Sequence, residues 1–398
     1  MNPAVPSPAS VTSPLAKAAP TLRIEGTGPV ALATALWLVR AGVPASRIAL
    51  PLADEATSIL PASGPQRALA LSAGSCQILS RLIALPASGR IGTVEIFQAG
   101  TNGHARIEAE DFALPALGHV VQWEALIRQL HEAARLLPFA SPDDPAFASP
   151  SLRIHAGGLP PPDRRNDRDF STRDSGQAGL LFEVECDGTR DTAFECFCPE
   201  GPLALLPAPP LDSGRPRFTV VWCDAAAEAS ARAQLNAEAL GEALQARLRA
   251  VLGLRAMRRQ GSCFQGMHVC TPAVAVPLPR VSRRQVTAPG EVWIGNAAQA
   301  LHPVAGQGLN LGLRDAFVLA RLLGDAWRQP VPDIDGALRA HARQRLADRE
   351  LTIGTTDLFA VAFGWPLAGR LQSVLLRALH VSPTLRRPLA NALVFGHR

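Results

Sequence analysis

The 398-residue sequence contains no tyrosine, so any mechanism that relies on a tyrosine hydroxyl is excluded. Its nine histidines show no H-E-x-x-H or other metal-ligand spacing. Cys196 and Cys198 stand one residue apart in a strand-like run, which does not suit a zinc pair. We therefore expect no metal site. The G-x-S-x-G motif of a serine hydrolase is missing as well.

Long apolar runs and basic blocks are also missing. No run reaches the ~20 apolar residues that a membrane-spanning helix needs, and no Lys/Arg block with interleaved aromatic residues indicates nucleic acid. Seven cysteines, an odd number without framework spacing, indicate reduced thiols in a cytoplasmic protein. Residues 1–20 are rich in Pro, Ala and Ser and lack the apolar core of a signal peptide, so we expect a disordered tail.

The remaining composition is that of a globular chain. Hydrophobic residues make up 47% and charged residues 18%, with a mean hydropathy of +0.11. A chain of this length can bury a sizeable core in one large or two interleaved domains. The net charge of +5 would suit an anionic cofactor or a lipid surface.

The stretch from Val292 to Leu323 is the most informative part of the chain. A short apolar strand pattern leads into a turn-prone segment with Gly306 and Gly308, and apolar residues then recur at helical spacing from Leu309. Glycines before a helix let a ligand approach the free N–H groups of its first turn. The helix dipole favours a negative or electron-rich group there. The glycines alone would also fit an ordinary strand–loop–helix.

A second glycine turn lies near the N-terminus. The strand candidate Thr21–Glu25 leads into G-x-G-x-x-A and an apolar helix that ends near Arg40. In this pattern Gly26 and Gly28 let a pyrophosphate approach, and Ala31 allows the helix to pack closely on the strand.

The next strand lacks an expected carboxylate. A dinucleotide site normally has Asp or Glu at the end of its second strand to hold the ribose. Here the strand Arg47–Leu50 is followed by Leu52 in that position, with Asp54 or Glu55 as candidate substitutes.

The string GNAAQALHPVAGQGLNLGLRD, from Gly295 to Asp315, resembles the second flavin motif of the class A flavoprotein aromatic hydroxylases. Within that class it is most similar to the ubiquinone-biosynthesis hydroxylases of polyprenylated phenols. The sequence Asn-Ala-Ala-Gln, in place of Asp-Ala-Ala-His, resembles the branch that hydroxylates 2-polyprenyl-6-methoxyphenol. The resemblance implies an α/β fold in which a Rossmann-like FAD-binding domain is interleaved with a β-sheet substrate domain and followed by a helical C-terminal region. The implied boundaries are 21–178 and 286–330 for the FAD-binding domain, 179–285 for the substrate-side sheet, and 331–398 for the helical region.

The resemblance also implies which residues hold FAD. Arg67, in a segment similar to the family's R-A-x-A-L-S, would lie beside the cofactor at the start of a helix from Gln66 to Leu82. Gln122 would approach the ribityl or phosphate region, and Asn296 would bond a ribityl hydroxyl. The implied cofactor-binding set is Gly26, Gly28, Ala31, Arg67, Gln122, Asn296, Pro303, Ala305, Gly306, Gln307, Gly308, Leu309 and Asn310. The candidate catalytic residues are His302, Pro303 and Gly306; the loop backbone would stabilise flavin charge, and His302 fits a loop-shaping role better than proton transfer.

The substrate side is expected to be a sheet. Four β-rich segments, Gly179–Cys186, Thr192–Phe197, Leu203–Leu206 and Arg217–Trp222, alternate with turns. Such a sheet would cover the flavin ring with apolar side chains; the candidates are Phe194, Leu203, Leu205 and Trp222, each of which could instead pack in the core. The family usually has strands before this sheet that lead to an Asp-Gly pair in contact with the cofactor. In this chain the corresponding hairpin, residues 137–151, is shortened, and Gly157-Gly158 is the nearest counterpart of that pair.

The tail from Phe363 mixes Leu, Val and Phe with Arg370, Arg377, Arg386 and Arg387. A basic amphipathic helix is typical of a membrane-surface or partner-binding face. Packing on the core explains the same pattern equally well.

Together these features predict an FAD-dependent monooxygenase that uses NAD(P)H and O2 to hydroxylate a prenylated phenol in ubiquinone biosynthesis. No base for the phenol can be named from the sequence. We expect a cytoplasmic protein with peripheral contact to the inner membrane and a quinone-biosynthesis complex as partner. One alternative is a non-catalytic paralogue that serves as a scaffold in such a complex, which Leu52 and the short hairpin favour. Another is a flavin hydroxylase with a smaller aromatic substrate.

Overall fold

The computed structural model describes residues 20–52, 67–165, 167–187, 189–209, 214–259, 264, 266–302, 306–361 and 366–396. The expected disordered tail, apart from Pro20, lies outside these residues. So do Asp54, Glu55, Pro303 and Ala305.

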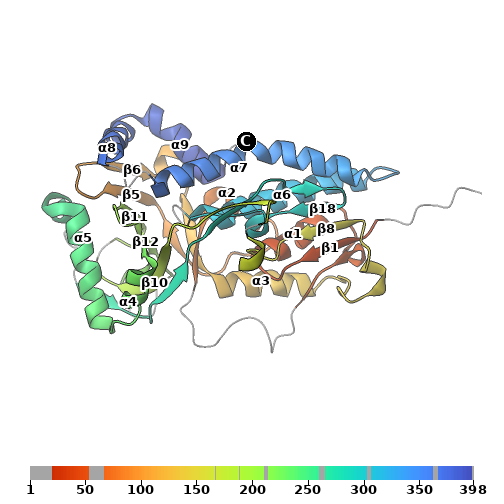
Figure 1. Ribbon diagram of the computed structural model, residues 1–398, viewed down its shortest axis with the longest axis horizontal. Helices are drawn as coiled ribbons and strands as arrows, with labels where there is room; N and C mark the ends of the chain where they lie inside the picture. The colour runs from red at the N-terminus through yellow and green to blue at the C-terminus, as the bar shows by residue number, and fades with distance from the viewer. Residues whose placement is uncertain are drawn as a thin grey trace, which may run out of the picture.

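A mainly parallel sheet forms one half of the protein, in the part of the chain that begins with the first predicted strand (Figure 1). Its order is β17-β18-β8-β1-β2, and only the edge pair β17–β18 is antiparallel. The strands are β1 (Leu22–Glu25), β2 (Ile48–Ala49), β8 (Leu152–His155), β17 (Thr287–Ala288) and β18 (Glu291–Trp293). One face of the sheet is apolar and packs with helices α1 (Pro29–Arg40), α3 (Trp123–Arg135) and α6 (Gln307–Trp327) in a single core.

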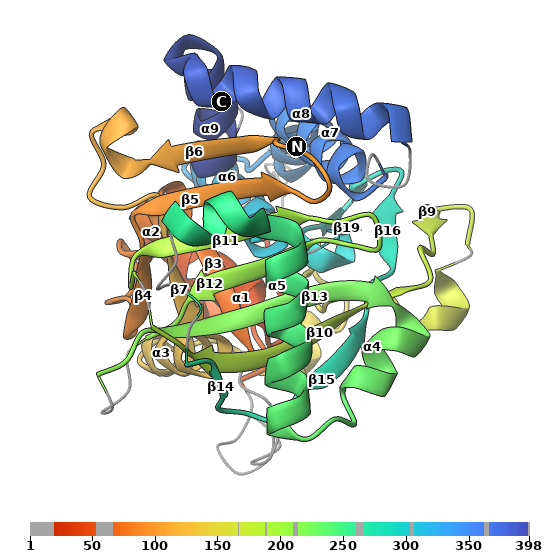
Figure 2. The same cartoon turned by 90° about the vertical axis from the view of Figure 1, so that its left-hand side faces the viewer.

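A larger, mostly antiparallel sheet forms the second half. Its order is β14-β10-β13-β12-β11-β5-β6, with β15 also paired to β10, and only β5 and β11 run parallel. The strands are β5 (Thr93–Gln98), β6 (His104–Glu108), β10 (Gln177–Glu185), β11 (Thr192–Phe197), β12 (Leu203–Pro207), β13 (Arg217–Ala225), β14 (His268–Val269) and β15 (Val274–Pro277). Strands β5 and β6 precede residue 178, so this sheet takes two strands from the segment assigned to the FAD-binding domain. Helix α5 (Ala237–Arg259) crosses its outer face, near the shorter α4 (Ala226–Arg232) (Figure 2).

Two small sheets join the halves. One has the order β3-β7-β4, from β3 (Ala68–Ser72), β4 (Ser88–Ile91) and β7 (Gly118–Gln122); the other has the order β19-β16-β9, from β9 (Phe170–Arg173), β16 (Arg280–Arg283) and β19 (Gln299–Ala300). The predicted helix from Gln66 to Leu82 is therefore wrong in its first part. Residues 68–72 alternate and pair with β7, and helix α2 (Ala73–Leu79) begins only afterwards. Pairing overrides helix propensity here, because Gly118 lets the strands approach: a Cβ at Gly118 would lie 2.3 Å from the Leu71 carbonyl oxygen.

The chain ends in three helices along one edge of the molecule (Figure 1). They are α7 (Ile334–Val361), α8 (Pro366–Val381) and α9 (Pro383–Phe395). Helix α7 packs on α6, α8 on β6, and α9 on α2 and β3. Among the described residues, no helix combines the length and the apolarity that crossing a membrane requires.

Candidate functional site

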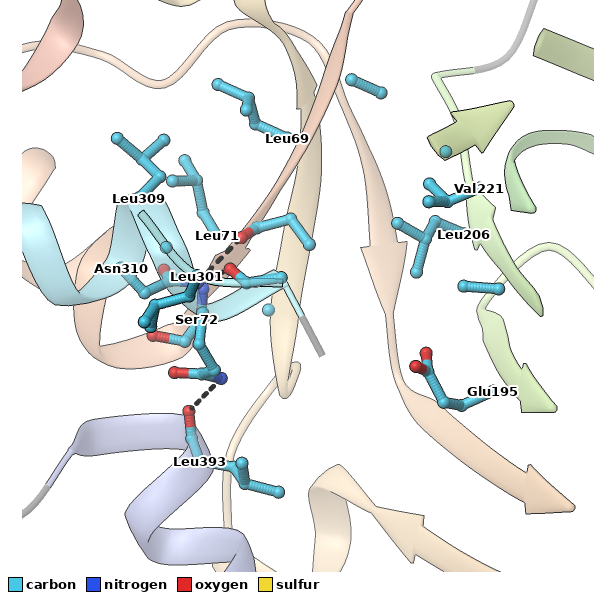
Figure 3. A pocket seen from close by; sticks show the side chains of 18 of the residues that line it. Leu69, Leu71, Ser72, Glu195, Leu206, Val221, Leu301, Leu309, Asn310 and Leu393 are labelled. Carbon is cyan, nitrogen blue, oxygen red and sulfur yellow. Dashed lines mark hydrogen bonds between the residues drawn. The ribbon is translucent and has the colours of Figure 1, made fainter. Parts of the chain in front are cut away.

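A cavity of about 870 Å³ lies between the parallel sheet and the large sheet. This volume falls within the range of small-molecule sites. Figure 3 shows Leu309 and Asn310 from the start of α6 on one side of the cavity, and Leu206 and Val221 from the large sheet on the other. Residues of the two glycine turns and of the large sheet thus line the same cavity.

The turn after β1 forms one end of the cavity. Gly26 has a φ of +122°, and a Cβ there would lie 2.5 Å from the Ala156 carbonyl oxygen, so the fold itself demands glycine. Gly28 differs, because a Cβ there would meet only the Trp123 ring, at an ordinary 3.8 Å. No contact with the described residues requires glycine at Gly28, and the space beside it belongs to the cavity. Ala31 does not line the cavity; it is fully buried and packs in the core.

The turn before α6 opens on the same cavity. Gly306 has a φ of +59°, and a Cβ there would lie 3.0 Å from the Ala70 Cβ. Among the described residues, no atom lies within 4 Å of the position that a Cβ at Gly308 would take. Neither α1 nor α6 has a side chain that caps its first turn. Two helix N-termini therefore present free N–H groups and positive dipole ends to one cavity.

Asn310 fixes this second turn to strand β3. Its side-chain amide donates to the carbonyl oxygens of Ala70 (2.9 Å) and Gly306 (2.7 Å), and its oxygen accepts from the Ser72 N–H (2.9 Å). Gln307 donates to the Leu393 carbonyl oxygen of α9 at 3.2 Å. The predicted cofactor-binding residues Asn310 and Gln307 thus also hold the turn in place.

Most of the predicted cofactor-binding residues come together around the cavity. Those that line it are Gly26, Gly28, Arg67, Asn296, Gly306, Gln307, Gly308, Leu309 and Asn310. Gln122 is not among them: its amide donates to the Glu183 carboxylate at 3.0 Å and ties the start of α3 to strand β10.

His302 is buried beside the cavity rather than lining it. Neither ring nitrogen has a hydrogen-bond partner among the described residues. Burial lowers the pKa of His302 to about 4, against a weaker opposing effect of Asp357. The ring is therefore neutral at physiological pH, which fits a packing role in the loop.

The depressed pKa of His302 predicts a loss of stability in acid. The unfolded chain binds a proton near pH 6.5 and the folded chain only near pH 4, so the stabilisation is complete above pH 6.5 and decreases as the pH falls toward 4. The expected loss at pH 4 is about 3 kcal/mol. Urea unfolding of the wild type and His302→Leu from pH 4 to 7.5 measures it. The variant should have the shallower pH dependence, and equal slopes would contradict the assignment.

The candidate apolar wall of Phe194, Leu203, Leu205 and Trp222 faces away from the cavity. These side chains are buried with α5 in the core of the large sheet, which is the packing role considered as the alternative. The alternate residues of the same strands, including Ala193, Leu206 and Val221, line the cavity instead. Within the described lining residues, Glu195 of β11 is the one carboxylate.

The C-terminal helices also line the cavity, a role that the sequence did not reveal. Leu376 and Leu379 of α8 and Ala390 and Val394 of α9 are buried and line it. Arg386 of α9 also lines it and donates to the Asp111 carboxylate at 2.8 Å. The amphipathic tail therefore both packs on the rest of the protein and lines the cavity.

Two observations bear on which ligands the protein can hold. Leu52 packs against the core of the parallel sheet, so the position that normally carries Asp or Glu holds an apolar side chain. Over the described ranges, no group of three or more His, Cys, Asp or Glu residues is arranged to hold a metal ion.

The chain is similar in sequence to curated ubiquinone-biosynthesis hydroxylases. It is 32% identical to 3-demethoxyubiquinol 3-hydroxylase of Escherichia coli over 197 residues, which are 47% of this chain and 44% of that protein. It is 30% identical to ubiquinone hydroxylase UbiL of Rhodospirillum rubrum over 195 residues, 48% of this chain and 42% of that protein. The match thus spans about half the length of these relatives or less. No family model matches the chain.

Solved structures share the fold. PqsL, a probable FAD-dependent monooxygenase of Pseudomonas aeruginosa, superimposes with a TM-score of 0.66 at 17% identity, over 90% of this chain and 99% of that one. p-Nitrophenol 4-monooxygenase PnpA of Pseudomonas putida gives 0.64 at 15% identity, over 95% and 99%. The predicted fold class, an α/β flavin-monooxygenase fold with a helical C-terminal region, is confirmed, as is the resemblance to the ubiquinone-biosynthesis hydroxylases.

Proposed function

We propose that this chain is an FAD-dependent monooxygenase that hydroxylates a prenylated phenol in ubiquinone biosynthesis, with NAD(P)H and O2 as co-substrates. The observation that carries the proposal is the single cavity onto which two uncapped helix N-termini open, opposite an apolar sheet. The sequence similarity to ubiquinone-biosynthesis hydroxylases supports the substrate class.

The residues around the cavity fit FAD. The pyrophosphate would lie over Gly28 at the start of α1, and the flavin's pyrimidine edge over Gly308 at the start of α6, because among the described residues a Cβ would make only an ordinary contact at Gly28 and none at Gly308. Arg67 would pair with a phosphate, and Asn296 would bond a ribityl hydroxyl. Bound FAD, reduced by NAD(P)H, supplies the transfer of an oxygen atom from O2 to the ring.

The chain's own contribution is positioning and exclusion of water. The Asn310 bonds keep the Gly306 turn at a fixed distance from β3, so the N–H groups of α6 stay aimed at the flavin edge, where negative charge develops. The apolar side chains of the sheet and of α8 and α9 leave little for water to bond. A prenyl chain would occupy the leucine-rich end beside Leu376 and Leu379.

Turnover of a prenylated phenol tests the function. The FAD-loaded protein is mixed with a short-chain 2-prenyl-6-methoxyphenol, NADH or NADPH, and 18O2. We expect phenol-stimulated oxidation of the nicotinamide and a product with one labelled oxygen atom. Faster turnover of unprenylated phenols would favour the smaller-substrate alternative. No labelled product from any phenol would contradict the proposal.

We also propose that the exposed side of α8 and α9 contacts an anionic membrane surface. Val374, Val381 and Leu385 are 66%, 78% and 55% exposed, and the exposed Arg377 lies among them. Leu375 is both exposed and part of the cavity lining, so the cavity reaches the surface at this patch. A lipid substrate could then enter from the bilayer.

Vesicle binding measures this contact. The double variant Val374→Asp/Val381→Asp should bind phosphatidylglycerol vesicles at least ~10-fold more weakly in a sedimentation assay. Each change removes apolar area that the membrane would bury, and each adds a negative charge that the anionic lipid repels. The control is Val331→Asp, which alters a 74% exposed valine elsewhere and should bind normally. Equal binding of all three proteins would contradict the proposed face.

A scaffold without catalysis is the second candidate, because Leu52 removes the usual ribose-binding carboxylate. In that case the partner would be other proteins of a quinone-biosynthesis complex. A protein that retains FAD and turns over the phenol excludes this candidate.

A further inference from the structure

Glu195 has an unusual position for a charged residue. It lies in the middle of β11, paired in register with Ile96 of β5 and Ala204 of β12. Both neighbours line the cavity on the same face of the sheet, as does Val221 of β13. The carboxylate points into the cavity, toward the wall that carries Ser72 and Leu301 (Figure 3). No other carboxylate is found among the described residues that line the cavity.

The other groups of the cavity are poor proton acceptors. The remaining charged side chains among the described lining residues are Arg67 and Arg386, and an arginine does not give up its proton in proteins. His302 does not line the cavity. A tyrosine relay is excluded because the chain has no tyrosine.

A phenol ring reacts with an electrophilic oxygen more readily once its hydroxyl has lost a proton. A carboxylate facing the ring is suited to accept that proton. The Glu195 wall lies across the cavity from the α6 turn, so a ring placed between them would meet the cofactor on one side and the carboxylate on the other (Figure 3).

We propose that Glu195 is the residue that binds and deprotonates the substrate's phenolic hydroxyl. This inference rests on the proposed function. The O–H bond of the phenol breaks, its electron pair stays on the phenol oxygen, and an O–H bond forms on the carboxylate. The electron-rich ring then accepts the oxygen atom that reduced flavin and O2 supply. The ring carbon that gains it releases its hydrogen to water as a proton, and Glu195 returns its own proton to the phenol oxygen.

The test uses Glu195→Gln, Glu195→Asp and the wild type, each loaded with FAD. Glu195→Gln keeps the size of the side chain but cannot accept the proton, so kcat should fall ~100-fold or more. Its activity should rise with pH as the substrate ionises by itself, whereas the wild type needs no such increase. Glu195→Asp should recover part of the rate. Glu228→Gln, which changes a carboxylate that is 62% exposed on α4, is the matched control and should behave as the wild type.

A binding measurement separates this role from a structural one. A chromophoric probe, 2-prenyl-4-nitrophenol, is titrated into each protein below the probe's own pKa. The wild type should bind it with the phenolate absorption band, and Glu195→Gln should bind it as the neutral phenol. A full phenolate band and normal kcat in a flavin-loaded Glu195→Gln would overturn the assignment. A wild type that retains FAD but turns over no phenol would overturn the proposed function, and this inference with it.

Discussion

Gly308→Val is expected to lower the affinity for FAD by ~10–100-fold while leaving the fold intact, since filling a well-packed contact costs about 1–3 kcal/mol. The valine side chain would occupy the space over the first turn of α6, where its Cβ would have no neighbour within 4 Å in the described part of the chain. The variant should therefore purify as a folded protein with little bound flavin. FAD content and a titration with added FAD measure the effect.

The same substitution elsewhere provides the control. Gly354 lies on the exposed side of α7, and a Cβ there would also have no neighbour within 4 Å over the described ranges. Gly354→Val should keep its flavin. Gly306→Val is expected to lose flavin too, but it is a weaker test, because its left-handed φ and the nearby Ala70 strain the protein itself. Normal FAD content in Gly308→Val would contradict the placement of the flavin edge.

Asp348→Ala is expected to destabilise the protein by about 3–5 kcal/mol, because it leaves buried arginines without their counter-charge. Asp348 is completely buried and accepts from Arg314 of α6 at 2.8 Å and from Arg345 of α7. Arg345 in turn binds Asp315 of α6 at 2.7 Å. This network fastens α7 to the helix that begins at the Gly306 turn, so its loss should also weaken FAD retention. Denaturant unfolding of the apoprotein measures the stability directly.

An exposed ion pair at the C-terminal end of α6 is the comparison. Asp325 is 53% exposed and binds Arg328 at 2.8 Å. Asp325→Ala should cost no more than ~1 kcal/mol, as surface ion pairs do. Similar losses for both variants would mean that the buried network does not hold the helices together.

The two glycine turns were largely predictable from the sequence. The strand–turn–helix pattern from Val292 onward corresponds to β18 and α6, and the N-terminal pattern corresponds to β1 and α1, which ends at Arg40 as predicted. Glycine spacing and apolar periodicity are local signals, and here local and tertiary preferences agree. The glycine-turn residues that line the cavity are therefore among those that the pattern indicated, and their role in binding FAD stays a prediction.

The face of the large sheet that lines the cavity was not predictable in the same way. Alternation shows that Phe194 and Glu195 point to opposite faces of β11, but both faces are largely apolar, so the pattern cannot tell the cavity from the core under α5. The bulky residues were assigned to the cavity, whereas the structure gives them to the core. Glu195, a lone carboxylate in a strand, was the signal that would have identified the cavity face.

Other errors arose where long-range pairing decides the structure. Residues 68–72 have helix-forming composition but become β3 because β7 offers a partner strand. The tail was correctly predicted to be helical and amphipathic. Its contribution to the cavity depends on the packing of α8 on β6 and of α9 on β3, strands that lie far away in the sequence. The bond between Arg386 and Asp111, which are 275 residues apart, is another such contact.

The most direct test of the central claim, that the two glycine turns hold FAD, is the visible absorption spectrum of the freshly purified protein with analysis of the flavin released by heat. We predict flavin absorption bands and FAD, rather than FMN, in the supernatant. A colourless protein that takes up no added FAD would contradict the cofactor site and favour the scaffold candidate.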